Sequence, residues 1–371
     1  MLHVLDLKPE TLPKSRKRQA MRMLQGLRPT INPIIVREVR TRMRGARPYA
    51  ILTAFLVLLA LTGFGIYQLM QQQARLGGLL LSAQVGQALF RGLAFVELML
   101  VVFLAPSMTS GAISGEREHL TYVLLMATPL RPGQILWGKL VAALSYLFLL
   151  IFAAVPVFSV VLVFGGVELR AMLKALALLI AATIYFGAIG LFCSAIMRRT
   201  ARATTIAYML VLLLVGVPML LASVWGQFTT PPGQQAPTAL FYLNPFSALL
   251  SVTTVAIGVG GDPTISAAPL LSFNDPFGGL PLLSVLGQGV IFYGPTGPVV
   301  MPIYRATLIA YGLLSVILCW VSAHTVLPNR RWRLRWGDLG FALLVLAFLV
   351  GAYLARGWWA IPGPSQFMGM G

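Results

Sequence analysis

The chain has 371 residues, of which 58% are apolar and only 10% are charged. Soluble domains carry about 25% charged residues, so this composition excludes a soluble globule and a disordered chain, and it indicates a protein that crosses a membrane several times. The formal net charge of +18 comes from 28 Lys and Arg residues against 10 Asp and Glu residues, and the positions of these charges decide whether nucleic acid is a candidate partner.

A basic tail covers residues 1–48 and holds 12 of the 28 basic residues. Its run KSRKR at 14–18 is of the kind found in nucleic-acid-binding patches. However, a long apolar stretch directly follows the tail in the sequence, and this order is typical of a cytoplasmic tail that precedes a membrane-spanning helix. We therefore interpret the run as part of a solvated cytoplasmic tail, and we expect the lipid bilayer, and not nucleic acid, among the partners of the chain.

An amphipathic helix is predicted over residues 32–47 of the tail. Apolar side chains recur there at helical spacing and basic side chains fall on another side, which is typical of a helix that lies in the membrane interface. Such a helix either anchors the chain to lipid or also transmits force to the first span. The residues that define its faces are Ile35, Val39 and Met43 on the apolar side and Arg37, Glu38, Arg40 and Arg44 among the charged ones.

Seven apolar stretches approach the roughly 20 residues that a membrane-spanning helix needs. They predict an all-α polytopic membrane protein with a six-span core and a shorter seventh span at the C-terminal end. The expected spans cover residues 49–70, 89–109, 135–164, 173–197, 204–225, 302–327 and 339–353.

The basic residues predict the orientation of these spans. With the N-terminus in the cytoplasm, 22 of the 28 Lys and Arg residues fall on the inner side, as the positive-inside rule requires. Nucleic acid is then not needed to explain the charge. The predicted organisation is the tail, spans one to five within 49–225, an exterior segment over 226–301, and spans six and seven within 302–371.

The exterior segment at 226–301 has no Lys or Arg, and it contains 10 Pro and 11 Gly. Helix breakers at this density exclude one continuous span. Two alternatives remain open for this segment. It is either a structured exterior loop or a set of short or re-entrant helices, some of which dip into the outer leaflet.

A short cytoplasmic helix is expected between spans two and three, at about 114–130. Glu116, Arg117 and Glu118 place charges at its start, apolar residues such as Leu124 follow, and Pro129 ends it. A loop that meets only water does not need apolar side chains. We therefore expect this helix to dock on the inner leaflet or on a partner protein.

This loop closely resembles the signature of the ABC-2 type transporter permeases. The family pattern is a glycine, then Glu-Arg-Glu, a Thr, a Leu pair and Thr-Pro-Leu, and the resemblance covers roughly residues 32–327. The family usually has Gly directly before the first Thr, where this chain has Leu120. The pattern is supplied here by Gly115, Glu116, Arg117, Glu118, Thr121, Leu124, Leu125, Thr128, Pro129 and Leu130.

The resemblance implies a permease subunit of an exporter of lipids, drugs, peptides or glycans, in a prokaryotic plasma membrane. It implies two partners, a cytoplasmic ABC ATPase subunit and a second permease subunit that forms a homodimer or heterodimer with this one. It also implies that the short helix is a coupling helix on the ATPase. The coupling residues are then Glu116, Arg117, Glu118, Thr121, Leu124, Thr128 and Pro129.

We expect no catalytic residues, no cofactor and no metal in this chain. Its sequence contains no GxxxxGK[ST] motif to hold ATP phosphates, so the resemblance assigns ATP and Mg to the partner ATPase. A non-transporting membrane anchor or regulator that recruits a cytoplasmic partner remains the alternative function. A membrane-embedded lipid-modifying enzyme is disfavoured, because His, Asp and Glu are scarce.

One acidic residue, Glu97, lies well inside a predicted span. A charge in the bilayer costs about 2.5–3.5 kcal/mol on insertion scales and is a functional candidate by default. Glu97 either lines a polar path or serves the packing of the bundle, including a hydrogen bond with a neighbouring helix, and the second interpretation is favoured.

Overall fold

The computed structural model describes residues 45–75, 82–122, 132–228, 237–255, 290–294, 297–300, 302–326 and 336–359. Ile35, Arg37, Glu38, Val39, Arg40, Met43 and Arg44 of the predicted interfacial helix lie outside these residues.

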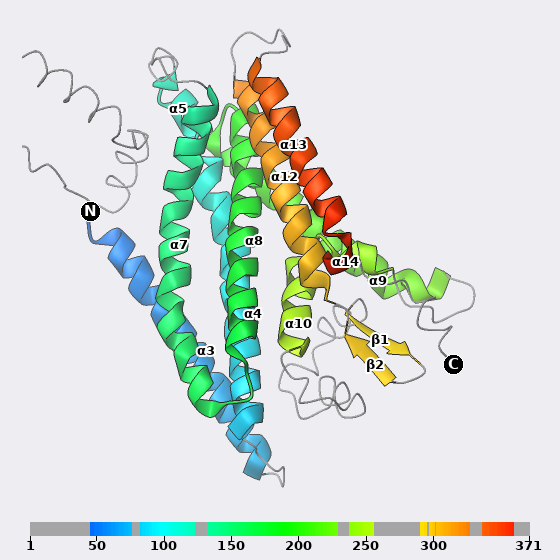
Figure 1. Ribbon diagram of the computed structural model, residues 1–371. Helices are drawn as coiled ribbons and strands as arrows, with labels where there is room; N and C mark the ends of the chain where they lie inside the picture. The colour runs from blue at the N-terminus through cyan, green and yellow to red at the C-terminus, as the bar shows by residue number, and fades with distance from the viewer. Residues whose placement is uncertain are drawn as a thin grey trace, which may run out of the picture.

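Six described helices are long and apolar enough to cross a membrane, which confirms an all-α polytopic membrane protein. They lie side by side in a bundle, with α9 crossing the others obliquely (Figure 1). Several begin or end beyond the predicted apolar stretches, because polar residues continue the helix past its apolar part. The six are α3 (Arg47–Arg75), α4 (Ser82–Ser110), α7 (Pro132–Phe164), α8 (Leu169–Ile196), α9 (Thr200–Phe228) and α12 (Ile303–Val326).

A seventh apolar helix, α13 (Trp336–Leu354), runs beside α12 (Figure 1). Its apolar part, Gly340–Leu354, is shorter than the six spans. Trp320 of α12 stacks on Phe341 of α13 with ring centroids 5.0 Å apart, so the two helices are packed together. The four-residue α14 (Arg356–Trp359) follows, and the crossing of the membrane by α13 stays a prediction.

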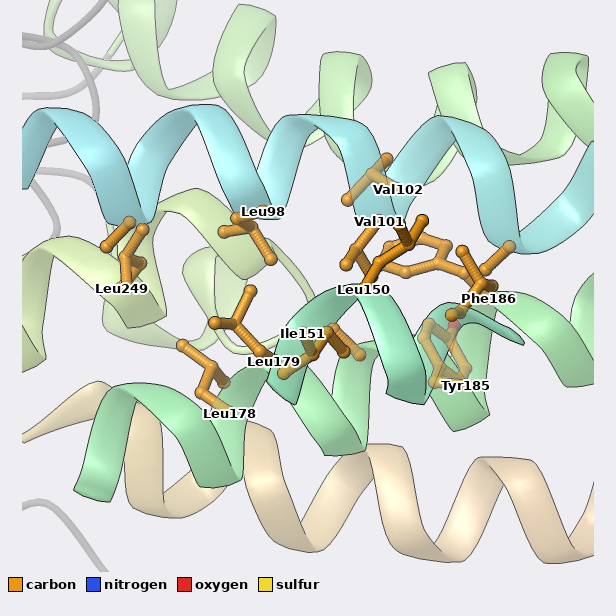
Figure 2. Close-up of a cluster of buried hydrophobic side chains, with 14 of the residues drawn as sticks. Leu98, Val101, Val102, Leu150, Ile151, Leu178, Leu179, Tyr185, Phe186 and Leu249 are labelled. Carbon is orange, nitrogen blue, oxygen red and sulfur yellow. The ribbon is translucent and has the colours of Figure 1, made fainter. Parts of the chain in front are cut away.

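Helices α4 and α8 form the centre of the bundle. In the most apolar stretch of each, 67% of the residues are buried, against 17% in α3 and in α9. Small residues let the two backbones approach closely: a Cβ atom on Gly190 would lie 2.1 Å from Thr109 Oγ1 and 2.7 Å from the Pro106 carbonyl oxygen. Elsewhere in the bundle, large buried side chains from α4, α7, α8 and α10 pack between the helices (Figure 2).

Part of the predicted exterior segment is a helix packed into the bundle. After the 3₁₀ helix η1 (Thr238–Phe241), helix α10 (Pro245–Val255) lies against α4, α8 and α12. Asn244 caps it, since its Oδ1 accepts a hydrogen bond from the Phe246 N–H at 3.0 Å. Ser251 Oγ accepts a hydrogen bond from the Tyr304 N–H at 3.1 Å, which joins α10 to the first turn of α12.

A two-stranded hairpin also occurs in this segment, where only short helices and loops were expected. Strands β1 (Ile291–Gly294) and β2 (Gly297–Val300) pair antiparallel. Stretches of four residues that contain Gly and Pro are too short to show the alternation typical of a strand. Pro298 is compatible with β2 because a proline, which has no N–H, is tolerated on an edge strand.

Candidate functional site at the α4–α7 corner

The α4–α7 corner, residues 111–122, begins where α4 ends. A turn leads into α5 (Ser114–Glu118), which lies at the same end of the bundle as the start of α7 and the end of α12 (Figure 1). Ser194, near the end of α8, accepts hydrogen bonds on its Oγ from the N–H groups of Ile113 and Ser114, both at 2.9 Å. These first N–H groups of a helix have no partner within it, so Ser194 fixes the start of α5 to α8.

Glu116 forms an ion pair with Lys139 of α7, and Glu116 Oε1 lies 2.9 Å from Lys139 Nζ. The Lys139 side chain is only 5% exposed, whereas that of Glu116 is 29% exposed. A buried ammonium is stable only near a counter-charge or hydrogen-bond acceptors. The Thr121 hydroxyl also donates a hydrogen bond to the Glu116 carboxylate. Glu116 therefore joins α5 and the end of the corner at Thr121 to α7.

Glu118 binds the first residue of α9. Its Oε1 accepts a hydrogen bond from the Thr200 N–H at 3.0 Å, and its Oε2 accepts one from the Thr200 hydroxyl at 2.7 Å. A carboxylate is favourable at this position, because the N-terminus of a helix carries partial positive charge and free N–H groups. Glu118 thus caps α9 from a different segment of the chain.

Arg117 and Tyr122 contact the ends of two more helices. Arg117 Nη1 donates a hydrogen bond to the carbonyl oxygen of Met197, directly after α8, at 3.3 Å. The guanidinium carbon lies 5.1 Å from the centroid of the Tyr122 ring. The Tyr122 hydroxyl donates a hydrogen bond to the carbonyl oxygen of Val326, the last residue of α12. Both helix ends carry partial negative charge, which these donors complement.

Leu120 holds the corner in an unusual backbone conformation. Its φ is +58° and its side chain is 84% exposed. It is the one non-glycine residue with positive φ in the described part of the chain. This conformation favours glycine because a Cβ crowds the backbone there. The position is also the one at which the family that the sequence resembles usually has glycine, so in this chain a leucine adopts, at a cost in strain, a conformation that suits glycine.

These contacts bring together four of the seven predicted coupling residues. Glu116, Arg117, Glu118 and Thr121 lie in one corner, whereas Leu124, Thr128 and Pro129 lie outside the described residues. The four make hydrogen bonds or ion pairs within the chain, and two carboxylates and one guanidinium join the corner to α7, α9 and α8. The corner can therefore transmit a displacement of residues 111–122 to several helix ends at once.

Sequence reasoning did not identify the residues on the other side of these contacts. Ser194 and Thr200 lie more than 70 positions after the corner in the sequence. Hydroxyl residues near helix ends are common caps, so their presence does not indicate a particular partner. For Lys139 a signal existed: a lysine in an apolar stretch requires a counter-charge, and the nearest acids before it are those of the corner.

Glu97 is far from the corner. It lies in the middle of α4, 13 residues before Ser110, which corresponds to about 20 Å along a helix. Its side chain is 1% exposed, and neither carboxylate oxygen has a hydrogen-bond partner among the described residues. A hydrogen bond from Glu97 to a neighbouring helix is therefore not present among the described residues, and its role in packing stays a prediction. Within the same residues, no three His, Cys, Asp or Glu side chains form a group that could hold a metal ion.

Comparison with known proteins gives one result that covers most of the chain. The profile of a family described as "ABC-2 family transporter protein" matches residues 33–325, a range that begins before α3 and ends one residue before the end of α12. No curated protein matches the chain.

Proposed function

Since this chain belongs to the ABC-2 family of transporter proteins and so is a membrane-embedded ABC transporter permease, we propose that it carries substrate in an exporter whose ATP is hydrolysed by a separate subunit. In this proposal residues 114–130 couple the two subunits, and ATP and Mg bind to the partner. The chain itself supplies no catalytic residue, no cofactor and no metal. The substrate is a lipid, drug, peptide or glycan, and the location is a prokaryotic plasma membrane.

The arrangement of the α4–α7 corner is the observation that supports this function. A coupling segment must move transmembrane helices when the ATPase moves it. The corner is joined to α7 by Glu116, to α8 by Arg117 and to α9 by Glu118, and the Tyr122 hydroxyl binds the end of α12. A non-transporting anchor has no need for a partner-binding loop that is connected to so many spanning helices.

A second permease subunit is part of the proposal, as a homodimer or heterodimer partner. The family implies it, and the outer helices leave room for it. Helices α3 and α9 expose large apolar side chains, among them Leu61, Phe64, Met209, Leu212 and Leu220, each of which is at least 60% exposed. Lipid covers such a surface, and a second subunit in the bilayer can replace part of that lipid.

The experiment compares two Glu to Gln variants at opposite ends of the bundle. The chain is co-expressed in turn with the ABC ATPases of its source organism, and any complex that forms is purified into lipid vesicles. Glu118 is exposed, so Glu118→Gln is expected to fold, and Glu168→Gln in the exposed turn between α7 and α8 is the matched control. We expect Glu118→Gln to lower ATP hydrolysis by the complex severalfold, while Glu168→Gln leaves it unchanged.

Three results would count against the proposal. If no ATPase co-purifies with the chain, the permease is not paired in the way proposed. If the complex forms but hydrolyses ATP at the rate of the ATPase alone, the anchor or regulator alternative is favoured. If Glu118→Gln and Glu168→Gln behave alike, the corner does not couple the two subunits.

A further inference from the structure

Glu97 is a buried acid that the proposed function does not use. Its side chain is 1% exposed, and neither carboxylate oxygen has a hydrogen-bond partner among the residues that the structure describes. A carboxyl group removed from water is unfavourable unless a donor or a cation lies next to it. Such a residue inside a membrane span is a candidate for binding a ligand.

The Glu97 side chain lines a cavity of about 100 Å³ between α4, α7 and α8. The remaining walls are apolar. Phe90 and Phe158, which form an edge-to-face pair with centroids 6.1 Å apart, are both buried in the wall. At the other end the lining residues Leu169 and Leu173 are 60% and 56% exposed. The cavity therefore opens between α7 and α8 on a surface that faces lipid.

The depth and size of the cavity limit what can enter it. Glu97 lies 15 residues after Ser82 and 13 residues before Ser110, the two ends of α4, which places it about 20 Å from either end along the helix. Glu97 is thus too deep for a phospholipid whose headgroup remains at the interface. Pockets that enclose a drug-sized molecule measure roughly 300–1,000 Å³. This smaller cavity holds one alkyl chain or one ring, with the rest of the ligand in lipid.

We propose that this cavity binds a hydrophobic amine, with its ammonium group against the Glu97 carboxylate and its apolar part directed toward the opening at Leu169 and Leu173. The ammonium supplies the donor and the positive charge that Glu97 lacks among the described residues. Aromatic walls favour a cation as well. Binding needs neither ATP nor the ATPase, so the site is independent of the proposed transport function.

Binding of radiolabelled octylamine to the full chain in phosphatidylcholine nanodiscs tests this proposal, with empty nanodiscs subtracted. We expect saturable binding that Glu97→Gln weakens about tenfold or more, because a charged hydrogen bond is lost. Octanol, which has the same chain and no charge, should bind more weakly and should not distinguish Glu97→Gln from the wild type.

A second pair of variants leaves Glu97 in place. Leu173→Trp narrows the cavity opening at a lipid-exposed position and should weaken octylamine binding. Leu212→Trp makes the same change on α9, where Leu212 is 69% exposed and does not line the cavity, and should have no effect. These variants test the site even if Glu97→Gln does not fold.

Equal binding of octylamine to the wild type, Glu97→Gln and Leu173→Trp would overturn the proposal. Equal binding of octylamine and octanol to the wild type would also overturn it.

Adding phosphatidylethanolamine to the nanodiscs tests whether the amine that binds is a lipid headgroup or a free amine. Competition by this lipid that depends on Glu97 would overturn the assignment to a free hydrophobic amine. A chain that transports with its ATPase but binds no octylamine would refute this inference and leave the proposed function intact.

Discussion

At the α4–α7 corner, a partly exposed carboxylate is paired with a buried ammonium. Glu116 can be reached by water, whereas Lys139 is enclosed in the bundle. The two residues therefore contribute unequally to stability, even though they form a single ion pair. Removing one partner of a buried pair is costly because of the charge that remains buried, rather than because of the contact that is lost.

We predict that Glu116→Gln destabilises the chain more than Lys139→Met does. Glu116→Gln withdraws a carboxylate from a buried ammonium, which costs up to about 3–5 kcal/mol. Lys139→Met leaves a carboxylate that water can solvate and fills the buried space with an apolar side chain, so we expect about 1 kcal/mol or less. Thermal unfolding in detergent would measure both, and the reverse order would show that the ammonium is not the buried partner.

At Leu120, in contrast to Glu116 and Lys139, we predict a substitution that raises the stability of the chain. Leu120→Gly should raise stability by up to about 1 kcal/mol, because glycine adopts positive φ without steric cost and the exposed leucine side chain contributes little. Leu120→Val should lower it, since a β-branched residue is strained at this φ. The midpoints of thermal unfolding of the two variants should therefore lie on either side of the wild type, and a lower midpoint for Leu120→Gly would contradict the argument.

Close packing of α4 on α8 is the main feature at the scale of elements. The Cβ contacts at Gly190 involve the backbone of α4 as well as a side chain, so the neighbour cannot simply rotate away. In α3, by contrast, a Cβ on Gly65 would meet nothing within 4 Å. The two glycines have the same sequence context, a helix in an apolar stretch, and different surroundings.

We predict opposite effects for one substitution at these two glycines. Gly190→Ala forces α4 and α8 apart and should cost about 1–3 kcal/mol, as overpacking of a core does. Gly65→Ala adds no clash and should be neutral or stabilise the helix by about 0.5–1 kcal/mol. Unfolding of both variants by denaturant in the same detergent gives the comparison. Equal effects would mean that the two helices do not approach as closely as described.

Apolar stretches were sufficient to predict the long helices, because in lipid every backbone polar group must be satisfied within the helix itself. They were not sufficient for α10, whose 11 residues are too few to span the bilayer and whose position depends on contacts with α4, α8 and α12. The hairpin of β1 and β2 was missed for a related reason. Its pairing is set by the register between the two strands and not by a pattern along either strand.

The candidate site was also predictable only in part, because a sequence pattern reveals contacts between neighbouring residues and not contacts between distant segments. Glu116, Arg117, Glu118 and Thr121 are neighbours in sequence, so their proximity was evident from the pattern. The partners of the corner as a whole on α8, α9 and α12 were not evident from the pattern, because only the packing of the whole bundle brings Ser194, Thr200 and Val326 to the same end.

At the scale of the whole molecule, the distribution of basic residues predicts which end of the bundle faces the cytoplasm. His119 in the corner and Glu168 between α7 and α8 are both exposed and lie at opposite ends of α7. The two native cysteines, Cys193 and Cys319, are both buried, so they provide a low background for labelling.

We predict that His119→Cys and Glu168→Cys react with a membrane-impermeant maleimide from opposite sides. In intact cells, the maleimide should label Glu168→Cys at once, and it should label His119→Cys only after the membrane is permeabilised. The unsubstituted chain measures the reaction of the buried native cysteines. Labelling of both variants in intact cells would contradict the topology, and labelling of His119→Cys alone would reverse it.

The contacts of the corner have very different separations along the chain. The pair of Glu116 and Lys139 spans 23 positions, the bond of Glu118 to Thr200 spans 82, and that of Tyr122 to Val326 spans 204. A chain made and inserted from its N-terminus can form the first contact early and the last only when α12 is in the membrane. Truncated or misinserted chains therefore lack a finished corner. Under the proposed coupling, synthesis of the whole bundle is the condition for engaging an ATPase, so incomplete permeases would not stimulate ATP hydrolysis by the partner.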